Sequence, residues 1–295
     1  MSERHCLILG ASGQVATALQ ARLGESPWRV TVLGRADNDL ADSVATREAV
    51  LRSGASVVVN AAAYTAVDKA ETDREGATAL NVLGPAAAAR AACEIGAPFI
   101  HFSTDYVFDG SKGQPYEESD PPSPLGVYGQ TKLAGEQAVA EANPEHLILR
   151  TSWVCSHTGS NFVRTMLRLA ETRDEIGVVA DQRGQPTFAD DLADGTLQIL
   201  ERIGQPDPTW GVFHMTGATD TTWFEFATAI MESAARRGAP HARINAITTA
   251  DYPTPVRRPA DSRLDCQLIA RTYGVRLPAW QDSLETCLER LLTTA

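Results

Sequence analysis

The sequence has little of what would cross-link a chain or bind a polyanion. Its five cysteines are scattered, odd in number and without a Cys-x-x-Cys spacing, so neither a disulfide framework nor a thiolate metal site is predicted. Lys and Arg total 26 against 37 Asp and Glu, and the net charge of −11 argues against binding to a nucleic-acid backbone. No hydrophobic run approaches the roughly eighteen residues of a membrane helix, and Cys6–Leu9 is too short for a signal peptide. We therefore expect a cytoplasmic protein with neither a nucleic-acid nor a membrane partner.

The first half of the chain alternates short apolar runs with longer helical patterns. Continuous hydrophobicity over about four residues is typical of parallel strands that are buried on both faces. Strand alternating with helix predicts an α/β fold, a Rossmann-like doubly wound parallel sheet. The expected strands are Cys6–Leu9, Val30–Leu33, Val57–Val59, Phe99–Phe102 and Leu147–Leu149, and the expected helices are Val15–Leu23, Thr46–Arg52, Asp73–Glu94 (kinked or broken at Gly84-Pro85) and Tyr128–Ala142.

The pattern loosens beyond about residue 150, where Pro- and Gly-bearing connections separate the helical stretches. We expect a dinucleotide-binding domain over residues 1–150 and a smaller, mainly substrate-binding lobe over residues 151–295. Some segments of the lobe should return to the sheet, and Gly211–Met215 is the candidate strand. The helices expected here are Asn161–Ala170, Leu192–Arg202, Thr222–Arg236 and Leu284–Leu292.

A glycine-rich turn, Gly10-Ala-Ser-Gly13-Gln-Val-Ala16, joins the first strand to the first helix. Gly10 permits a tight turn, Gly13 lets the backbone approach a pyrophosphate, and Ala16 is small enough for close helix–strand packing. The helix N-terminus adds free N–H groups and the positive end of its dipole. The turn therefore predicts dinucleotide binding by Gly10, Ser12, Gly13, Gln14 and Val15.

The end of the second strand indicates which nicotinamide cofactor is preferred. An acid there binds the ribose 2′-hydroxyl of NAD, whereas an Arg accommodates the 2′-phosphate of NADP. Arg35 follows this strand in the stretch Leu33–Leu40. The planar guanidinium fork suits a phosphate, so NADPH is favoured, and use of NADH remains open.

Tyr128 and Lys132 lie four residues apart at the start of an expected helix, which places them on one helical face. This spacing alone is common. Its position after the fourth strand–helix unit matters more, because Thr104 follows the preceding strand, and the carboxyl ends of parallel strands form the ligand edge of such a sheet. We expect Thr104, Tyr128 and Lys132 to converge there.

These residue types suit the reduction of a ketone. A carbonyl that accepts hydride develops alkoxide character, so a proton donor must lie against its oxygen. Tyrosine, with a pKa near 10, is a weak acid–base group, and a nearby ammonium is expected to lower that pKa. Lys132 would also bind the nicotinamide ribose, and Thr104 would hydrogen-bond the substrate oxygen or Tyr128.

Taken together, these features resemble the extended short-chain dehydrogenase/reductase superfamily and, within it, the dTDP-4-dehydrorhamnose reductase family. The similarity runs from residue 5 to about residue 290. The stretches that carry it beyond the glycine turn are Val59–Glu71, Ser103–Gly110, Ser123–Glu136, Arg150–Val154, Asn161–Met166, Asp181–Thr187 and Arg258–Leu264.

The resemblance implies reduction of the C4 keto group of dTDP-4-dehydro-β-L-rhamnose by NADPH or NADH. Tyr128 would be the proton donor, Lys132 its pKa modulator, and Thr104 the third catalytic group. Further roles implied by the resemblance are substrate binding by Thr104, Asp105, Tyr128, Trp153 and Arg263, and cofactor binding by Ala62, Ala63 and Thr65, by Asp39 and Leu40 on the adenine side, and by Tyr128 and Lys132.

One departure from the family pattern concerns magnesium, which some members bind at a dimer interface through a carboxylate on the first helix. Thr17–Gln20 contains no acid, and Mg²⁺ requires oxygen ligands. We therefore expect no bound metal, and a monomer or a weak homodimer.

Two other functions on the same scaffold stay open. A non-catalytic NADP-binding regulatory subunit would not need the trio of Thr104, Tyr128 and Lys132. A nucleotide-sugar epimerase or dehydratase usually has an Asp-Glu pair after the threonine, whereas here Asp105 is followed by Tyr106.

Overall fold

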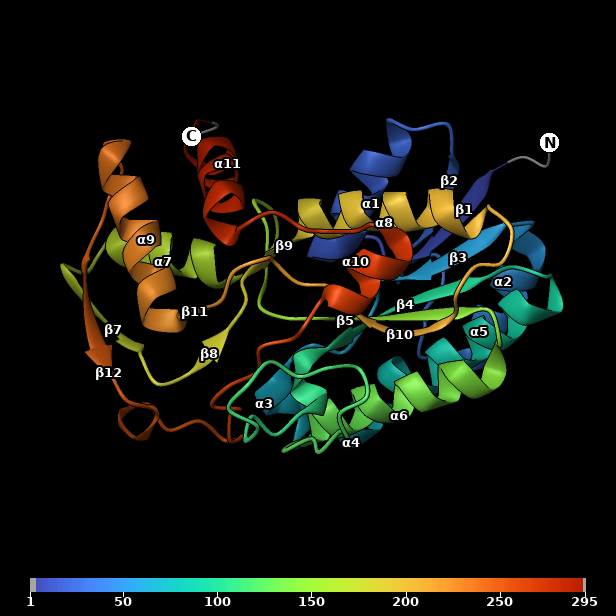
Figure 1. The fold of residues 1–295 in the computed structure, drawn as a ribbon, viewed down its shortest axis with the longest axis horizontal. Helices are drawn as coiled ribbons and strands as arrows, with labels where there is room; N and C mark the ends of the chain where they lie inside the picture. Colours follow the sequence, from blue (N-terminus) through green and yellow to red (C-terminus); the bar gives the residue numbers. More distant parts are fainter. Residues whose placement is uncertain (1–3, 294–295) are drawn as a thin grey trace.

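The computed structural model describes residues 4–293. Its centre is a six-stranded sheet with strand order β10-β5-β4-β3-β1-β2, in which every neighbouring pair is parallel (Figure 1). This is the predicted doubly wound α/β fold. The strands are β1 (His5–Leu9), β2 (Arg29–Leu33), β3 (Val57–Asn60), β4 (Phe99–Thr104), β5 (His146–Thr151) and β10 (Gly211–His214).

Burial differs between the central and the edge strands. All residues of β1, β3 and β4 are buried, as their continuous apolar character predicts. The prediction that Val30–Leu33 is buried on both faces is wrong: β2 pairs only with β1, and none of its residues is fully buried. An edge strand receives fewer helices on its faces, so hydrophobicity alone did not reveal its position.

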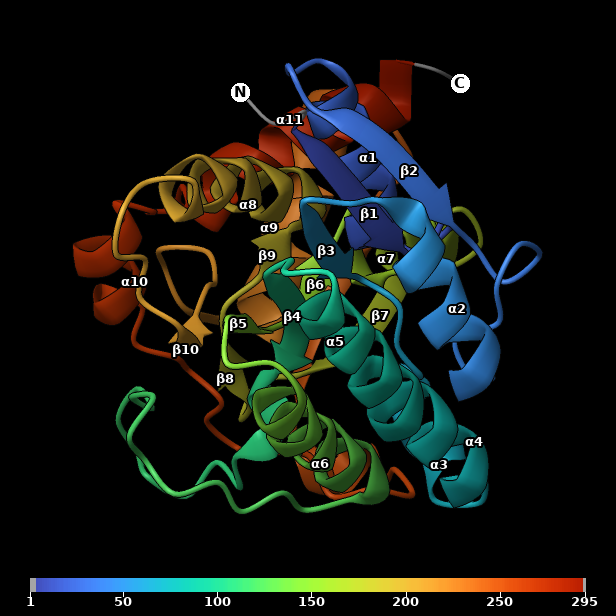
Figure 2. The same cartoon turned by 90° about the vertical axis from the view of Figure 1, so that its right-hand side faces the viewer.

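Helices cover both faces of the sheet (Figures 1 and 2). One layer contains α1 (Gln14–Gly24), α8 (Ala189–Ile203) and α10 (Gln267–Tyr273), whose apolar residues share a core with the sheet. The other contains α2 (Ser43–Ser53), α5 (Gly84–Glu94) and α6 (Val127–Ala142). The expected helices are therefore present, with ends that differ by a few residues.

The helical stretch expected over Asp73–Glu94, with a kink or break at Gly84-Pro85, is divided at that point. It consists of α4 (Arg74–Thr78), a π-helix (Ala79–Leu83) and α5. Pro85 has no N–H to donate to the carbonyl of Asn81, and a π-turn absorbs such a missing bond. That carbonyl lies against α6, where a Cβ on Gly135 would come within 1.9 Å of it. The irregular turn thus lets α6 pack closely.

Most of the remaining elements form a second layered unit beyond the C-terminal edge of the sheet (Figure 1). Its core is built around Phe226, Ile230 and Leu288. β10 lies in this half of the sequence yet pairs with β5, as predicted for Gly211–Met215. The division at residue 150 stays a prediction. Of the remaining elements, α3 (Val67–Ala70) lies on the sheet side. The others are β6 (Val154–Cys155), α7 (Phe162–Ala170), β7 (Glu175–Val179), β8 (Arg183–Gly184), β9 (Thr187–Phe188), β11 (Thr221–Thr222), α9 (Trp223–Arg236), β12 (Arg243–Ile247) and α11 (Trp280–Thr293).

Within residues 4–293, no helix combines the length and the apolar character needed to cross a membrane.

Candidate active site

The glycine turn lies at the point where the strand order reverses, between β1 and β3. Gly10 has a φ of +105°, a conformation that side chains rarely adopt. A Cβ at this position would lie 3.1 Å from the backbone nitrogen of Ala62, directly after β3. Gly10 is therefore required both for the turn and for the close approach of the two strand ends.

The first turn of α1 is free to receive an anion. Gly13 occupies the N-cap and offers no side-chain hydrogen bond, and the first turn contains no acid. The backbone N–H groups of such a helix end need an external acceptor. Ser12 is exposed beside them, whereas the side chain of Val15 packs against the core. This geometry fits a pyrophosphate.

The side chain of Gln14 connects the turn to the second half of the chain. Its Oε1 accepts a hydrogen bond of 2.8 Å from Asn161, and its Nε2 lies 3.4 Å from the carbonyl oxygen of Val154. The amide group of Gln14 is thus engaged by protein, and its predicted cofactor contact would come from the backbone.

The adenosine end of the predicted cofactor site is open. Arg35 and Asp39 are exposed after β2. Leu40 instead belongs to the core between the sheet and α2, so its side chain does not face solvent. Beyond β3, Ala62 and Ala63 are half-buried and Thr65 is exposed, in line with a surface that follows a bound molecule.

Thr104 and Tyr128 meet where β4 ends and α6 begins, and Lys132 follows on the same helix. Thr104 is the last residue of β4, and its hydroxyl donates a 3.0 Å hydrogen bond to Asp105 Oδ1. Tyr128 lies in the first turn of α6, with its ring edge-on to Tyr106 at 5.6 Å. Lys132 follows one turn later and is 2 % exposed. Thr104 and Tyr128 therefore lie together at the ligand edge as expected, whereas the ammonium of Lys132 is turned toward the carbonyl oxygen of Phe102.

The electrostatics of the trio differ from the expectation. Burial raises the pKa of Tyr128, which a hydrogen bond with Thr104 partly offsets. The ammonium of Lys132 donates a 2.6 Å hydrogen bond to the carbonyl oxygen of Phe102 and points into the sheet. The predicted lowering of the Tyr128 pKa by Lys132 is therefore wrong for this structure. Burial instead lowers the pKa of Lys132 to about 8.

Asp105 presents an unsatisfied oxygen at this edge. The residue is 2 % exposed, and its Oδ2 is buried without a hydrogen-bond partner. Burial raises its pKa to about 6, an effect that the hydrogen bond from Thr104 partly offsets. A buried acceptor without a donor is costly for a fold, which is typical of a group that serves a ligand.

Trp153 is held in a strained conformation beyond β5. Its φ is +45°, which is unusual for a large side chain. The indole stacks on Trp223 with ring centroids 3.5 Å apart, and a Cβ on Gly184 would meet it at 2.4 Å. Neither Trp223 nor Gly184 was predicted as a site residue, because nothing in the local sequence connects α9 or β8 to β5.

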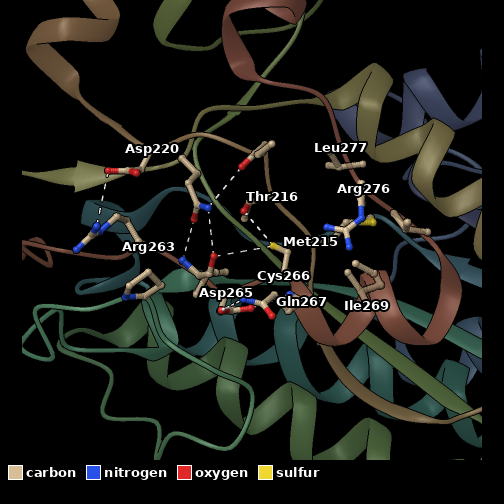
Figure 3. A pocket seen from close by; sticks show the side chains of 17 residues that line it. Met215, Thr216, Asp220, Arg263, Asp265, Cys266, Gln267, Ile269, Arg276 and Leu277 are labelled. Carbon is tan, nitrogen blue, oxygen red and sulfur yellow. Dashed lines mark hydrogen bonds and ion pairs between the residues drawn. The ribbon is translucent and has the colours of Figure 1, made fainter.

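Arg263 lies further along the same side of the fold. It forms ion pairs with Asp261 at 2.6 Å and with Asp220 at 3.8 Å, and it lines a cavity of about 290 Å³ (Figure 3). The residues that line this cavity do not include Thr104 or Tyr128. The predicted substrate contact of Arg263 stays a prediction.

Comparison with known proteins places this geometry in a family. A family model described as "RmlD substrate binding domain" matches residues 4–293. The chain belongs to the RmlD substrate binding domain family.

Relatives of this RmlD-family chain match it over nearly their whole length. A dTDP-4-dehydrorhamnose reductase of Sinorhizobium fredii is 45 % identical, and the match covers 97 % of each chain. A solved dTDP-4-dehydrorhamnose reductase of Clostridium acetobutylicum has a TM-score of 0.92 at 35 % identity, covering 98 % of this chain and 99 % of that one. The solved dTDP-4-dehydrorhamnose reductase of Bacillus anthracis, in complex with NADP, has a TM-score of 0.90 at 31 % identity. The match covers 97 % of this chain and 99 % of that one.

A buried polar network behind the trio was missed by the sequence analysis. Glu136 of α6, Arg150 of β5 and Ser103 of β4 are all nearly inaccessible and hydrogen-bonded together. The one signal in this RmlD-family sequence was the spacing of four residues that relates Tyr128, Lys132 and Glu136 on α6. Their partners on other strands could not be read from it.

Among residues 4–293, no cluster of three or more His, Cys, Asp or Glu side chains could hold a metal ion.

Proposed function

We propose that the chain reduces the C4 keto group of dTDP-4-dehydro-β-L-rhamnose to give dTDP-β-L-rhamnose, with NADPH favoured over NADH. The observation that carries this proposal is the meeting of Thr104 and Tyr128 at the C-terminal edge of β4, in an RmlD-family chain whose relatives are named dTDP-4-dehydrorhamnose reductase. An uncapped helix N-terminus beside a glycine turn on the same sheet edge supports it further.

The dinucleotide would be held by the glycine turn and the strand ends next to it. Backbone groups of Gly10, Ser12 and Gly13, with the first turn of α1, suit the pyrophosphate. Ala62, Ala63 and Thr65 would flank it after β3, while Asp39 and the backbone of Leu40 lie on the adenine side. The bound dinucleotide supplies the hydride for C4.

The proton would come from Tyr128. Because its pKa is raised, the phenol is fully protonated near neutral pH, as a proton donor must be. The O–H of Tyr128 would donate to the keto oxygen as negative charge develops there. Thr104 can hydrogen-bond the same oxygen or the phenol, which orients the two groups for transfer.

Lys132 would act chiefly as a buried positive charge. Its ammonium lies one helical turn from Tyr128 and favours negative charge that develops nearby. A pKa of about 8 keeps it mostly protonated at pH 7. Binding of the nicotinamide ribose by this ammonium would also fix the ring that delivers hydride.

The substrate would be enclosed between the sheet edge and the second layered unit. Asp105 offers an unsatisfied acceptor for a sugar hydroxyl, and Trp153 offers a flat apolar surface. Arg263 would contribute positive charge near the diphosphate. In this proposal the protein works in the cytoplasm on a small molecule, as a monomer or weak homodimer, without a nucleic-acid, membrane or metal requirement.

An assay with purified protein tests the proposal. Reduced cofactor and the keto-sugar nucleotide are mixed, and absorbance of NADPH or NADH is followed. We expect oxidation at a rate that depends on both reactants, and faster with NADPH. Absence of oxidation with either cofactor would contradict the proposal. Tightly bound NAD⁺ in the purified protein would favour an epimerase or dehydratase, and a co-purifying partner would favour a regulatory subunit.

A further inference from the structure

The buried face of α6 carries a third ionisable residue beyond the two assigned to the reaction. Glu136 is four residues after Lys132, as Lys132 is four after Tyr128, so the three follow one stripe of the helix. Glu136 is 3 % exposed and has no role in the proton transfer proposed above. A carboxylate this deeply buried persists only with strong compensating partners.

Those partners come from two strands of the sheet. Arg150 of β5 donates to both carboxylate oxygens of Glu136, at 3.0 Å from Nε and 2.7 Å from Nη2. Ser103 of β4 donates its hydroxyl to Oε1 at 2.5 Å. This bidentate pairing has a fixed geometry, so it locks the third turn of α6 to β4 and β5.

Four consecutive residues of β4, 101–104, lie along the helix stripe, and each has its own partner there. His101 and the carbonyl oxygen of Phe102 contact the Lys132 ammonium at 3.3 and 2.6 Å. Ser103 donates to Glu136, and Thr104 lies beside Tyr128. Any slip of α6 along β4 would break all these contacts together. The clamp on Glu136 therefore sets the register of both catalytic side chains.

Glu136 also balances charge around Lys132. Asn60 Oδ1 accepts from the N–H of Ala62, so its Nδ2 donates to His101 Nδ1 at 2.9 Å. A neutral His101 then carries its proton on Nε2, which faces the Lys132 ammonium and opposes its protonation. Burial lowers the pKa of His101 well below its usual value, so the ring stays neutral. The negative charge of Glu136 acts in the other direction and raises the pKa of Lys132.

Two further groups complete the surroundings of the stripe. Tyr128 lies on the side of the predicted substrate, and its phenol is uncharged near neutral pH because burial raises its pKa. Arg150 forms an ion pair with Glu136 and offsets part of its negative charge. The balance at Lys132 therefore depends on how much of the Glu136 charge Arg150 neutralises.

We infer that Glu136 is a positioning residue of this reductase: clamped by Arg150 and Ser103, it holds Lys132 in register with β4 and supplies the negative charge that keeps the buried ammonium protonated. The kinetic consequences rest on the proposed function, whereas the titration of Lys132 can be measured without any turnover.

The chain contains three lysines, Lys69, Lys112 and Lys132, so ¹³Cε-labelled lysine gives a spectrum simple enough to titrate. Lys132→Arg assigns the signal. In Glu136→Gln we expect the pKa of Lys132 to fall by about one unit, because the compensating charge is lost. In Arg150→Gln we expect the pKa of Lys132 to rise, because no guanidinium then offsets the negative charge of Glu136. The signals of Lys69 and Lys112 should not move.

Breaking a buried ion pair can unfold a protein, so the double variant Glu136→Gln/Arg150→Gln is included. It leaves two neutral amides of similar size, and its Lys132 pKa should lie between those of the single variants. Thermal melts show which variants are folded. A purely structural role would not produce this order of pKa values.

Ser103→Ala is the matched control, because it removes one clamp bond and leaves the charge of Glu136 in place. Its Lys132 pKa should stay near that of the unaltered protein. In steady-state assays, the pH at which kcat/KM declines on the alkaline side should fall in Glu136→Gln by the shift seen in the titration.

The outcomes separate the inference from the proposed function. An inactive unaltered protein whose Lys132 titrates in the expected order would contradict the reductase proposal and support the charge balance. An active enzyme in which Glu136→Gln leaves both the Lys132 pKa and the alkaline decline unchanged would overturn the inference. Shifts in one direction for both single variants would also overturn it.

Discussion

Two ends of the candidate site are built in opposite ways. The catalytic strip, defined as residues 101–104 of β4 with Tyr128, Lys132 and Glu136 of α6, is closely packed and internally hydrogen-bonded. The cofactor cradle, defined as the glycine turn with Arg35 and Asp39, is open and carries exposed charges. Proton transfer needs groups fixed in a low-dielectric environment, whereas recognition of a large anionic cofactor needs free donors.

The comparison predicts where substitutions change chemistry and where they change affinity. Substitutions in the strip should alter kcat, pH dependence or stability. Substitutions in the cradle should alter cofactor binding and leave the chemical step nearly intact. The four predictions below run from the largest expected effect to the smallest: three test this division, and Asp105→Asn tests the buried acceptor that lies next to the strip.

Tyr128→Phe removes the proton donor and leaves the ring that packs on Tyr106. We expect kcat to fall about 10³-fold, within the usual contribution of a general acid, while the Kd for NADPH changes little. Steady-state kinetics and fluorescence titration with NADPH measure the two quantities. Tyr252→Phe, at a residue that is 60 % exposed, is the control. A comparable loss of NADPH affinity would break the division between strip and cradle.

Asp105→Asn should stabilise the protein and impair its function. The folded pKa of about 6 lies above the ordinary value of 3.8, so the unfolded chain loses this proton first and stability falls as pH rises from about 4 to about 6. At about 1.36 kcal/mol per pKa unit, the ionised carboxylate costs about 3 kcal/mol at pH 8. Urea denaturation at pH 8 should show this gain for Asp105→Asn, and at pH 4 the gain should vanish.

The control for that pH dependence is Asp109, whose pKa is lowered chiefly by hydrogen bonds from Ser111. Asp109→Asn should change stability in the opposite sense, with a loss at pH 8. Equal effects of the two substitutions would show that burial of Asp105 is not a functional cost.

Gly10→Ala tests the cradle. A side chain at φ +105° is strained by about 2 kcal/mol, and its Cβ would press on the backbone of Ala62. We expect the Kd for NADPH to rise at least about tenfold, with a smaller change in kcat at saturating cofactor. Gly54→Ala is the matched control, because it has a φ of +61° with nothing within 4 Å of the added Cβ. It should lower stability and leave the Kd unchanged.

Arg35→Ala is expected to have the smallest effect. Loss of the guanidinium should raise KM for NADPH about tenfold and leave KM for NADH unchanged, since only NADPH carries the 2′-phosphate. Arg90→Ala, at an exposed position on α5, is the control for loss of a surface charge. Equal changes with both cofactors would show that Arg35 does not read the 2′-phosphate.

The sequence predicted the parts of the molecule that depend on local patterns. The buried strands β1, β3 and β4 and the helices that follow them arise from hydrophobic periodicity. The glycine turn and the Tyr128–Lys132 spacing are local too, and their meeting with Thr104 follows from the rule that parallel strands end at one edge. Even the return of β10 to the sheet was visible as a late apolar run.

Features that depend on distant partners were missed or predicted wrongly. The edge position of β2 follows from which strands pair. The stacking of Trp153 on Trp223 joins the segment after β5 to α9, although the two residues are 70 positions apart in the sequence. No periodicity encodes such contacts.

Lys132 shows where the boundary lies. Its spacing from Tyr128 predicted that the two side chains share a helical face, and the place of the pair after the fourth strand–helix unit predicted that this face lies at the ligand edge of the sheet. Only the tertiary structure decided what the ammonium does there: it binds the carbonyl of Phe102, lies against His101, and is balanced by Glu136. A helix repeat determines which residues are neighbours on one element, whereas burial and charge are set by every element packed around them.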